Sequence, residues 1–156
     1  MAIKVGNKGV ANIFIGSTPV KSVHKGSTKI WASESWHTIF DTETTWSGNT
    51  TSTTVFASTT NESKKFRITY KGNGPYVTIY KNVSRNPNTE YTDTFEISDT
   101  GTIAMIQTSY SNFMSGDESS VQILYNVSTK EFSVKLKRVG NITTASITIY
   151  KIEQLF

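Results

Sequence analysis

Cysteine is absent from the 156-residue sequence. Its absence excludes disulfide bonds, thiolate catalysis and cysteine-ligated zinc. Histidine is scarce as well, since the chain has only His24 and His37, and neither lies in a motif with a nucleophile or with metal ligands. The patterns G-x-S-x-G and H-E-x-x-H and a phosphate-binding glycine loop are also missing. We therefore predict that the chain is not an enzyme and that it has no catalytic residue, metal or cofactor.

Long apolar runs and clusters of one charge are missing too. No apolar run approaches the roughly 18 residues of a membrane-spanning helix, and the first residues lack the apolar core of a signal peptide. Lys and Arg number 16 against 12 Asp and Glu, a net charge of +4, and no run of basic residues reaches five. We expect no nucleic-acid binding and no membrane insertion, and we expect synthesis in a cytoplasm.

Threonine, serine and aromatic residues dominate what is present. The chain has 24 threonines and 19 serines, together more than a quarter of its residues. Threonine favours strands because its branched Cβ fits a pleated surface, and both residues compete with the helix backbone for hydrogen bonds. Hydrophobic residues make up only 36% but aromatic residues 12%, so Trp, Tyr and Phe must supply much of the core. The composition predicts an all-β protein.

The first 34 residues contain a ten-residue repeat. Gly6, Gly16 and Gly26 are each preceded by a β-type triplet and followed by a further β-branched residue. Glycine provides the backbone freedom of a tight turn, so the repeat predicts a β-meander of short strands with these three glycines in its turns. Units this small cannot bury a face of their own. Residues 1–34 are therefore predicted to be an attachment or oligomerisation module, with an edge hairpin of the main domain as the alternative.

Residues 35–156 form a second predicted domain, an antiparallel β-sandwich of the jelly-roll kind. Strand-like runs recur about every 12 residues with turn signals between them. In 64–71 apolar and polar residues alternate, and Gly72-Asn73-Gly74-Pro75 predicts a turn that would make 64–81 a hairpin. A second hairpin is predicted around 128–130. The nine expected strands are 35–40, 53–58, 64–71, 76–81, 89–98, 102–110, 121–126, 131–138 and 145–152.

Two pairs of carboxylates carry the weak case for an enzyme. Asp41 with Glu43 and Asp117 with Glu118 could flank a sugar bond as in a glycosidase. Neither pair has the apolar setting that would raise a carboxyl pKa. We interpret both as solvated turn charges.

Exposed aromatic side chains are the candidate ligand contacts. Aromatic rings stack on sugar rings, and Trp46 in Trp46-Ser47-Gly48-Asn49 reads as a tryptophan at a loop entrance with polar neighbours. Tyr76 and Tyr80 are further candidates. The alternative for Trp46 is a place in the core, because the chain is poor in aliphatic residues.

The segment from Ile13 to Trp31 resembles a pattern of tailed-bacteriophage structural proteins, I-x-x-G-S-x-x-V-x-x-I-x-x-G-S-x-x-V/I-W. The remaining residues are similar only in style to the jelly-roll-type domains of phage head fibres, capsid decoration proteins and tail tips. His24 stands where an aromatic residue is more usual. The pattern is architectural, so it implies no functional residue here.

This resemblance implies a non-enzymatic virion component, assembled in the host cytoplasm and located in the virion. It would be a head fibre or a capsid decoration protein, docked by residues 1–34 and displaying the sandwich outward. Its expected partners are other virion structural proteins of the capsid or tail and copies of itself, as a dimer or trimer. Host-surface glycans are a further candidate partner. The alternative function is a carbohydrate-binding or receptor-binding module of a tail tip.

Overall fold

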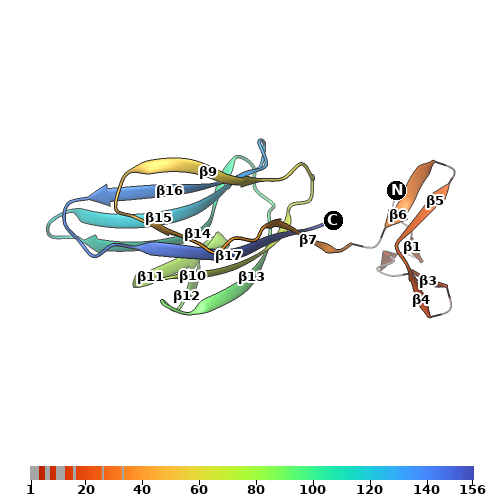
Figure 1. Cartoon of the computed structure of the whole chain (residues 1–156), viewed down its shortest axis with the longest axis horizontal. Helices are drawn as coiled ribbons and strands as arrows, with labels where there is room; N and C mark the ends of the chain where they lie inside the picture. The colour runs from red at the N-terminus through yellow and green to blue at the C-terminus, as the bar shows by residue number, and fades with distance from the viewer. Residues whose placement is uncertain (1–3, 6–7, 10–12, 16, 26, 33) are drawn as a thin grey trace. The chain divides into compact units, whose positions relative to one another are not determined.

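The computed structural model describes residues 4–5, 8–9, 13–15, 17–25, 27–32 and 34–156. The chain divides into two compact units (Figure 1). One consists of Met1–Trp36 together with Phe156, and the other of His37–Leu155.

The first unit contains three two-stranded antiparallel hairpins, β1 with β2, β3 with β4 and β5 with β6. In the described residues the strands pair only within each hairpin, so the predicted meander consists of separate ribbons. Ser17 and Ser27 lie in turns, whereas Gly6, Gly16 and Gly26 lie outside the described residues. The strands are β1 (Lys4–Val5), β2 (Lys8–Gly9), β3 (Ile13–Ile15), β4 (Thr18–Val20), β5 (Ser22–Lys25) and β6 (Thr28–Ala32).

The second unit is an antiparallel β-sandwich, which confirms the predicted fold class. The strand order in the first sheet is β13-β10-β17-β7, with β8 also pairing β17, and in the second sheet it is β12-β11-β14-β15-β16-β9. One 3-10 turn, η1 (Tyr80–Asn82), interrupts the strands. The strands are β7 (Trp36–Phe40), β8 (Thr44–Ser47), β9 (Ser52–Ser58), β10 (Lys65–Gly72), β11 (Tyr76–Ile79), β12 (Val83–Arg85), β13 (Glu90–Glu96), β14 (Thr102–Asn112), β15 (Asp117–Asn126), β16 (Glu131–Val139) and β17 (Ser146–Leu155).

The core lies between the two sheets and is rich in aromatic rings. Strand β10 buries Phe66, Ile68 and Tyr70 and leaves the residues between them partly exposed, as its alternating pattern predicts. From the second sheet, the rings of Tyr125 and Phe132 lie 4.7 and 5.3 Å from that of Phe66. Burial of apolar surface, at about 25 cal/mol per Å², therefore holds the sheets together.

The predicted hairpin over 64–81 is wrong, although its turn exists. Strand β10 pairs with β13 and β17, and β11 pairs with β12 and β14, so the two strands belong to different sheets. Asn73 is still tied to the first sheet, since its N–H donates to the Ser146 carbonyl at 3.1 Å. The N–H of Gly74 already donates to Thr108 Oγ1 in the second sheet at 2.9 Å. The Gly-Asn-Gly-Pro turn therefore carries the chain across the sandwich.

Gly74 has no room for a side chain at this crossing. An added Cβ would lie 2.3 Å from Thr108 Oγ1 and 2.8 and 3.0 Å from the backbone oxygen and nitrogen of Ser109. Gly74→Ala is expected to lower the free energy of unfolding by about 1–3 kcal/mol, because strand β14 would have to shift. Urea unfolding followed by tryptophan fluorescence measures this change. The control is Ala104→Ser at an exposed position of β14, which should change stability by less than about 0.5 kcal/mol. Unaltered stability of Gly74→Ala would contradict the close approach.

The other predicted hairpin is confirmed, with β15 and β16 paired from Asn126↔Glu131 to Glu118↔Val139. The nine predicted strands correspond to nine of the eleven strands between residues 36 and 155. The two that sequence reasoning missed are β8 and β12, of four and three residues. Strands this short carry too few alternations to be recognised from their pattern.

An ion pair joins one edge of the first sheet to one edge of the second. Arg85 on β12 donates from Nη2 and Nε to both carboxylate oxygens of Asp93 on β13, at 2.5 and 3.0 Å. The buried Tyr70 donates its hydroxyl to the same carboxylate at 2.8 Å. Burial raises the pKa of the Asp93 carboxyl, but the hydrogen bonds from Arg85 and Tyr70 and the Arg85 charge outweigh it and lower that pKa overall. The pair therefore acts as a clamp between the sheets.

Candidate functional site

Trp46, the first candidate ligand contact, lies on β8 and is half-buried against the core. Its ring centroid is 4.5 Å from that of Phe56 and 6.3 Å from that of Phe40. This placement matches the alternative considered from the sequence, in which Trp46 packs in the core.

The other two candidates lie at opposite ends of β11. Tyr76 begins the strand and is 68% exposed. Tyr80 follows the strand end, where its hydroxyl donates to Asp99 at 2.8 Å and Lys81 lies over its ring. Four residues of extended chain separate them by about 13 Å. The structure therefore does not bring Trp46, Tyr76 and Tyr80 together as one aromatic platform.

Five connections gather at one end of the sandwich, and we call this set the loop end. They lie opposite the end at which β7 begins and β17 finishes, where Ser35 and Phe156 exchange two backbone hydrogen bonds. In the first sheet, Gly72 and Ser47 pair with Ile147 and Ser146 at the start of β17. In the second sheet, Val139 at the end of β16 pairs with Glu118 near the start of β15. The connections are 48–51, 73–75, 86–89, 113–116 and 140–145.

Hydrogen bonds hold the loop end in place. The buried Ser119 hydroxyl donates to the Gly48 carbonyl at 2.7 Å and accepts from the Ala145 N–H at 2.9 Å. The Tyr110 hydroxyl donates to the carbonyl of Asn73 at 2.9 Å. Loops on such a rigid scaffold are the usual carriers of binding residues. Asparagine is the recurrent polar residue of this end, at positions 49, 73, 86, 88, 112 and 141.

The 113–116 turn presents two apolar side chains to solvent. Phe113 is fully exposed and Met114 is 97% exposed. The turn is closed by Asn112, whose side-chain oxygen accepts from the N–H groups of Met114 and Ser115 at 3.0 and 3.4 Å. Gly116 has a φ of 72°, which suits glycine. An exposed aromatic and methionine pair on an ordered turn is a candidate contact for a partner.

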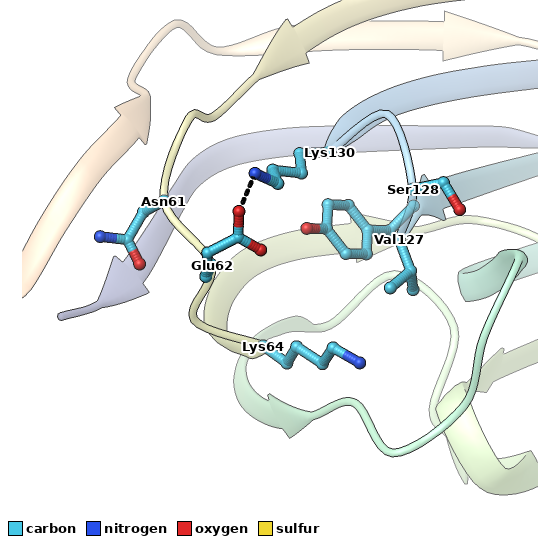
Figure 2. A pocket seen from close by; sticks show the side chains of 7 residues that line it. Asn61, Glu62, Lys64, Val127, Ser128 and Lys130 are labelled. Carbon is cyan, nitrogen blue, oxygen red and sulfur yellow. Dashed lines mark hydrogen bonds and ion pairs between the residues drawn. The ribbon is translucent and has the colours of Figure 1, made fainter. Parts of the chain in front are cut away.

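A pocket of about 220 Å³ lies near the other end of the sandwich. One wall is the connection between β9 and β10, with Glu62 and Lys64, and the other is the turn between β15 and β16, with Val127 and Lys130. Figure 2 shows Glu62 and Lys130 pointing toward one another as an ion pair, with Lys64 along the lower rim. The full lining is Asn61, Glu62, Lys64, Tyr125, Val127, Ser128 and Lys130.

The carboxylates do not assemble into a catalytic or metal-binding group in the described part of the chain. Glu118 pairs with Lys137 at 2.5 Å. Its neighbour Asp117 precedes it on β15, so the two side chains point to opposite faces. No group of three or more His, Asp or Glu side chains that could hold a metal occurs among the described residues.

Glu153 on β17 is a carboxylate paired with two basic side chains. Arg67 donates to it from Nε at 2.7 Å and Lys151 lies 3.0 Å away. The hydrogen bond from Arg67 lowers the pKa of the Glu153 carboxyl, burial opposes this, and Lys151 adds to the lowering. Such a charge-paired carboxylate fits a structural role better than acid catalysis.

The sequence predicts a loop over 113–117, but sequence reasoning identified neither Phe113 and Met114 as a candidate contact nor the pocket. The sequence does contain a signal for this contact. Phe113 and Met114 are apolar residues between Asn112 and Ser115-Gly116, in a turn, where polar residues are usual. The pocket left no comparable signal, since its walls come from separate stretches of the chain.

Comparison of the chain with protein-family models, with curated proteins and with solved structures finds no match. Within the described residues, no helix has the length and apolar character needed to cross a membrane.

Proposed function

We propose that this chain is a non-enzymatic structural component of a phage virion, a head fibre or capsid decoration protein. Residues 1–34 dock it to the particle or to sister copies, and the sandwich is displayed outward. The chain is assembled into the virion in the host cytoplasm, as a dimer or trimer. No cofactor, nucleic acid or membrane takes part.

One observation carries the proposal: a ten-residue repeat is built as three small hairpins and is joined to a sandwich. Each hairpin has two strands of two to five residues, and isolated two-stranded ribbons are marginal in water. Hairpins of this size gain stability when a partner covers them, as an attachment module requires. The resemblance of residues 13–31 to phage structural proteins supports the same function.

Immunogold electron microscopy of purified particles tests the proposal. Antibody raised against the purified protein is expected to label phage particles purified from cultures in which the chain is produced. Label over heads would identify a head fibre or decoration protein, and label at tail ends would favour the alternative function. Particles that carry no label, and whose proteome lacks the chain, would exclude the virion proposal.

The alternative function, a carbohydrate-binding or receptor-binding module of a tail tip, is favoured by the loop end. Phe113, Met114 and Tyr76 are exposed there, beside polar loops rich in asparagine. Aromatic side chains of this kind anchor interfaces through their buried area.

Removing the two apolar side chains tests this alternative. Phe113→Ser/Met114→Ser is expected to reduce binding of the purified protein to host cells about tenfold, equivalent to roughly 1.4 kcal/mol. The melting temperature should stay within about 2 °C, because neither side chain is buried. The matched control is Val55→Ser, which removes an exposed apolar side chain on β9. Equal binding by all three proteins would exclude the loop end as the contact.

A further inference from the structure

The pocket beside β15 is lined by the hydroxyl of Tyr125, a tyrosine whose ring is buried in the core. Tyr125 is only 2% exposed, and its ring packs against those of Phe66 and Phe132, each 4.7 Å away. Its hydroxyl makes no hydrogen bond to any residue that the structure describes, although Tyr125 lines the pocket. In the described part of the chain no buried side-chain nitrogen or oxygen lacks a hydrogen-bond partner, so this unpartnered hydroxyl is accessible from the pocket. A bound ligand would supply that partner.

The charges around this hydroxyl are unbalanced. Glu62 forms an ion pair with Lys130 (Figure 2). Lys64 has no acidic partner among the described residues, so the pocket lining carries one uncompensated positive charge. Burial raises the pKa of the Tyr125 hydroxyl and the Glu62 charge raises it further, so this hydroxyl stays protonated. The pocket thus offers a free ammonium group, a neutral hydroxyl, a carboxylate and an apolar wall at Val127.

Both walls of the pocket are held by hydrogen bonds. The fully buried side chain of Gln154 accepts from the Thr59 hydroxyl at 2.6 Å and donates to the Ser63 carbonyl at 2.6 Å, which pins the 59–64 connection. On the other wall, the Asn126 side chain accepts from the N–H groups of Ser128 and Thr129 at 2.9 and 3.1 Å. A site that is ordered in the absence of ligand loses little conformational entropy on binding.

We propose that this pocket binds one anionic sugar or polyol unit. The anionic group pairs with Lys64, a ligand hydroxyl bonds with the Tyr125 hydroxyl, and the Glu62 carboxylate accepts from a second hydroxyl. The pocket is smaller than the roughly 300–1,000 Å³ of sites for drug-sized ligands, so a single unit fits it. The anionic group is a carboxylate, as in a uronic acid, or a phosphate, as in glycerol phosphate.

Titration of the full-length chain followed by amide NMR shifts tests this site. Four probes are used separately: glucuronate, glycerol 3-phosphate, glucose and inorganic phosphate. Glucuronate or glycerol 3-phosphate is expected to shift the amides of 61–64 and 125–130 with a millimolar Kd, and the tighter of the two identifies the anionic group. Glucose and inorganic phosphate are expected to bind at least tenfold more weakly. The proposal is overturned if neither anionic polyol shifts these amides, or if inorganic phosphate binds as well as they do.

Charge variants separate the site from general attraction to a basic protein. Lys64→Gln is expected to weaken binding of the better probe about tenfold, and Lys135→Gln, the same charge change at an exposed position of β16, to leave it unchanged. Tyr125→Phe keeps the packing ring but removes the hydroxyl, and is expected to weaken binding severalfold. Equal losses for Lys64→Gln and Lys135→Gln would overturn the proposal. All of these measurements use the protein in solution, so they are independent of the virion proposal.

Discussion

Asp93→Ala is expected to lower the free energy of unfolding of the sandwich by about 3 kcal/mol, near the lower end of the range for breaking a buried ion pair. The Asp93 and Arg85 side chains are only 16% and 24% exposed. The variant leaves the Arg85 guanidinium and the buried Tyr70 hydroxyl without their shared acceptor. For a domain of this size the melting temperature should fall by roughly 10 °C, as measured by differential scanning calorimetry.

Glu96→Ala is the matched control, because it removes an exposed carboxylate from the same strand and should change stability by less than about 0.5 kcal/mol. The double variant Arg85→Ala/Asp93→Ala completes a thermodynamic cycle. Its loss should be smaller than the sum of the two single losses, because each single variant strands the other partner. If Asp93→Ala were no worse than Glu96→Ala, Arg85 and Asp93 would not clamp the sheets.

The pH dependence of unfolding provides a second measurement of the same clamp. The pKa of the Asp93 carboxyl is lowered in the folded protein, so its contribution to stability is fully present above the unfolded-state pKa of about 3.9. That contribution is lost as the pH falls through the folded-state pKa. The wild-type protein is therefore expected to lose stability below about pH 4 more steeply than Asp93→Asn. Parallel curves for the two proteins would contradict the assignment.

Phe66→Ala is expected to cost about 3–5 kcal/mol, the range for truncating a buried phenylalanine. Phe66 is fully buried and contacts Tyr125 and Phe132 from the opposite sheet. The cavity would open at the centre of the sandwich, where rigid strands on both sides limit collapse. Since single domains are stable by about 5–15 kcal/mol, the variant should be partly unfolded at 37 °C in urea concentrations that the wild type tolerates.

Phe66→Leu keeps a large apolar side chain but removes the aromatic ring, so it measures the aromatic contact apart from the packing. It is expected to lower the free energy of unfolding by about 1.5 kcal/mol or less. Trp46 lies among the packed aromatic residues of the sandwich, so its fluorescence reports unfolding of this unit. A loss below about 1 kcal/mol for Phe66→Ala would mean that the core does not depend on this cluster.

The alternation of residues was enough to predict nine of the eleven strands between residues 36 and 155 and the buried face of β10, but not the short strands β8 and β12. Phe66, Ile68 and Tyr70 turn inward as their spacing predicts, and the 127–130 turn joins two paired strands. Pairing partners were a different matter. A strand of either sheet buries one apolar face and exposes one polar face. The alternation of apolar and polar residues on the two sides of Gly72-Asn73-Gly74-Pro75 is therefore the same whether the two strands pair in one sheet or lie in different sheets.

The candidate site was less accessible from the sequence than the fold was. Trp46 was the best single candidate from its neighbours, and its half-buried place beside Phe40 and Phe56 follows from a scarcity of aliphatic side chains. Tyr125 lies two residues after Ile123, on the same buried face of the strand, as a core residue does. Its sequence neighbourhood contains nothing that indicates a free hydroxyl. The meeting of Tyr125 with Glu62 and Lys64 depends on tertiary packing, which brings the 59–64 connection against the end of β15.

The closed turn at 113–116 has a consequence for how its side chains would meet a surface. Because Asn112 already holds the backbone, the main entropic cost of a contact falls on the side chains of Phe113 and Met114, at about 0.5–1.5 kcal/mol for each one that is immobilised. A single contact made this way is weak but quickly reversible. On a particle that carries many copies, each contact after the first is intramolecular, so overall attachment becomes tight while each copy still exchanges rapidly. An ordered turn of four residues would thus suit a particle that moves across a surface without leaving it.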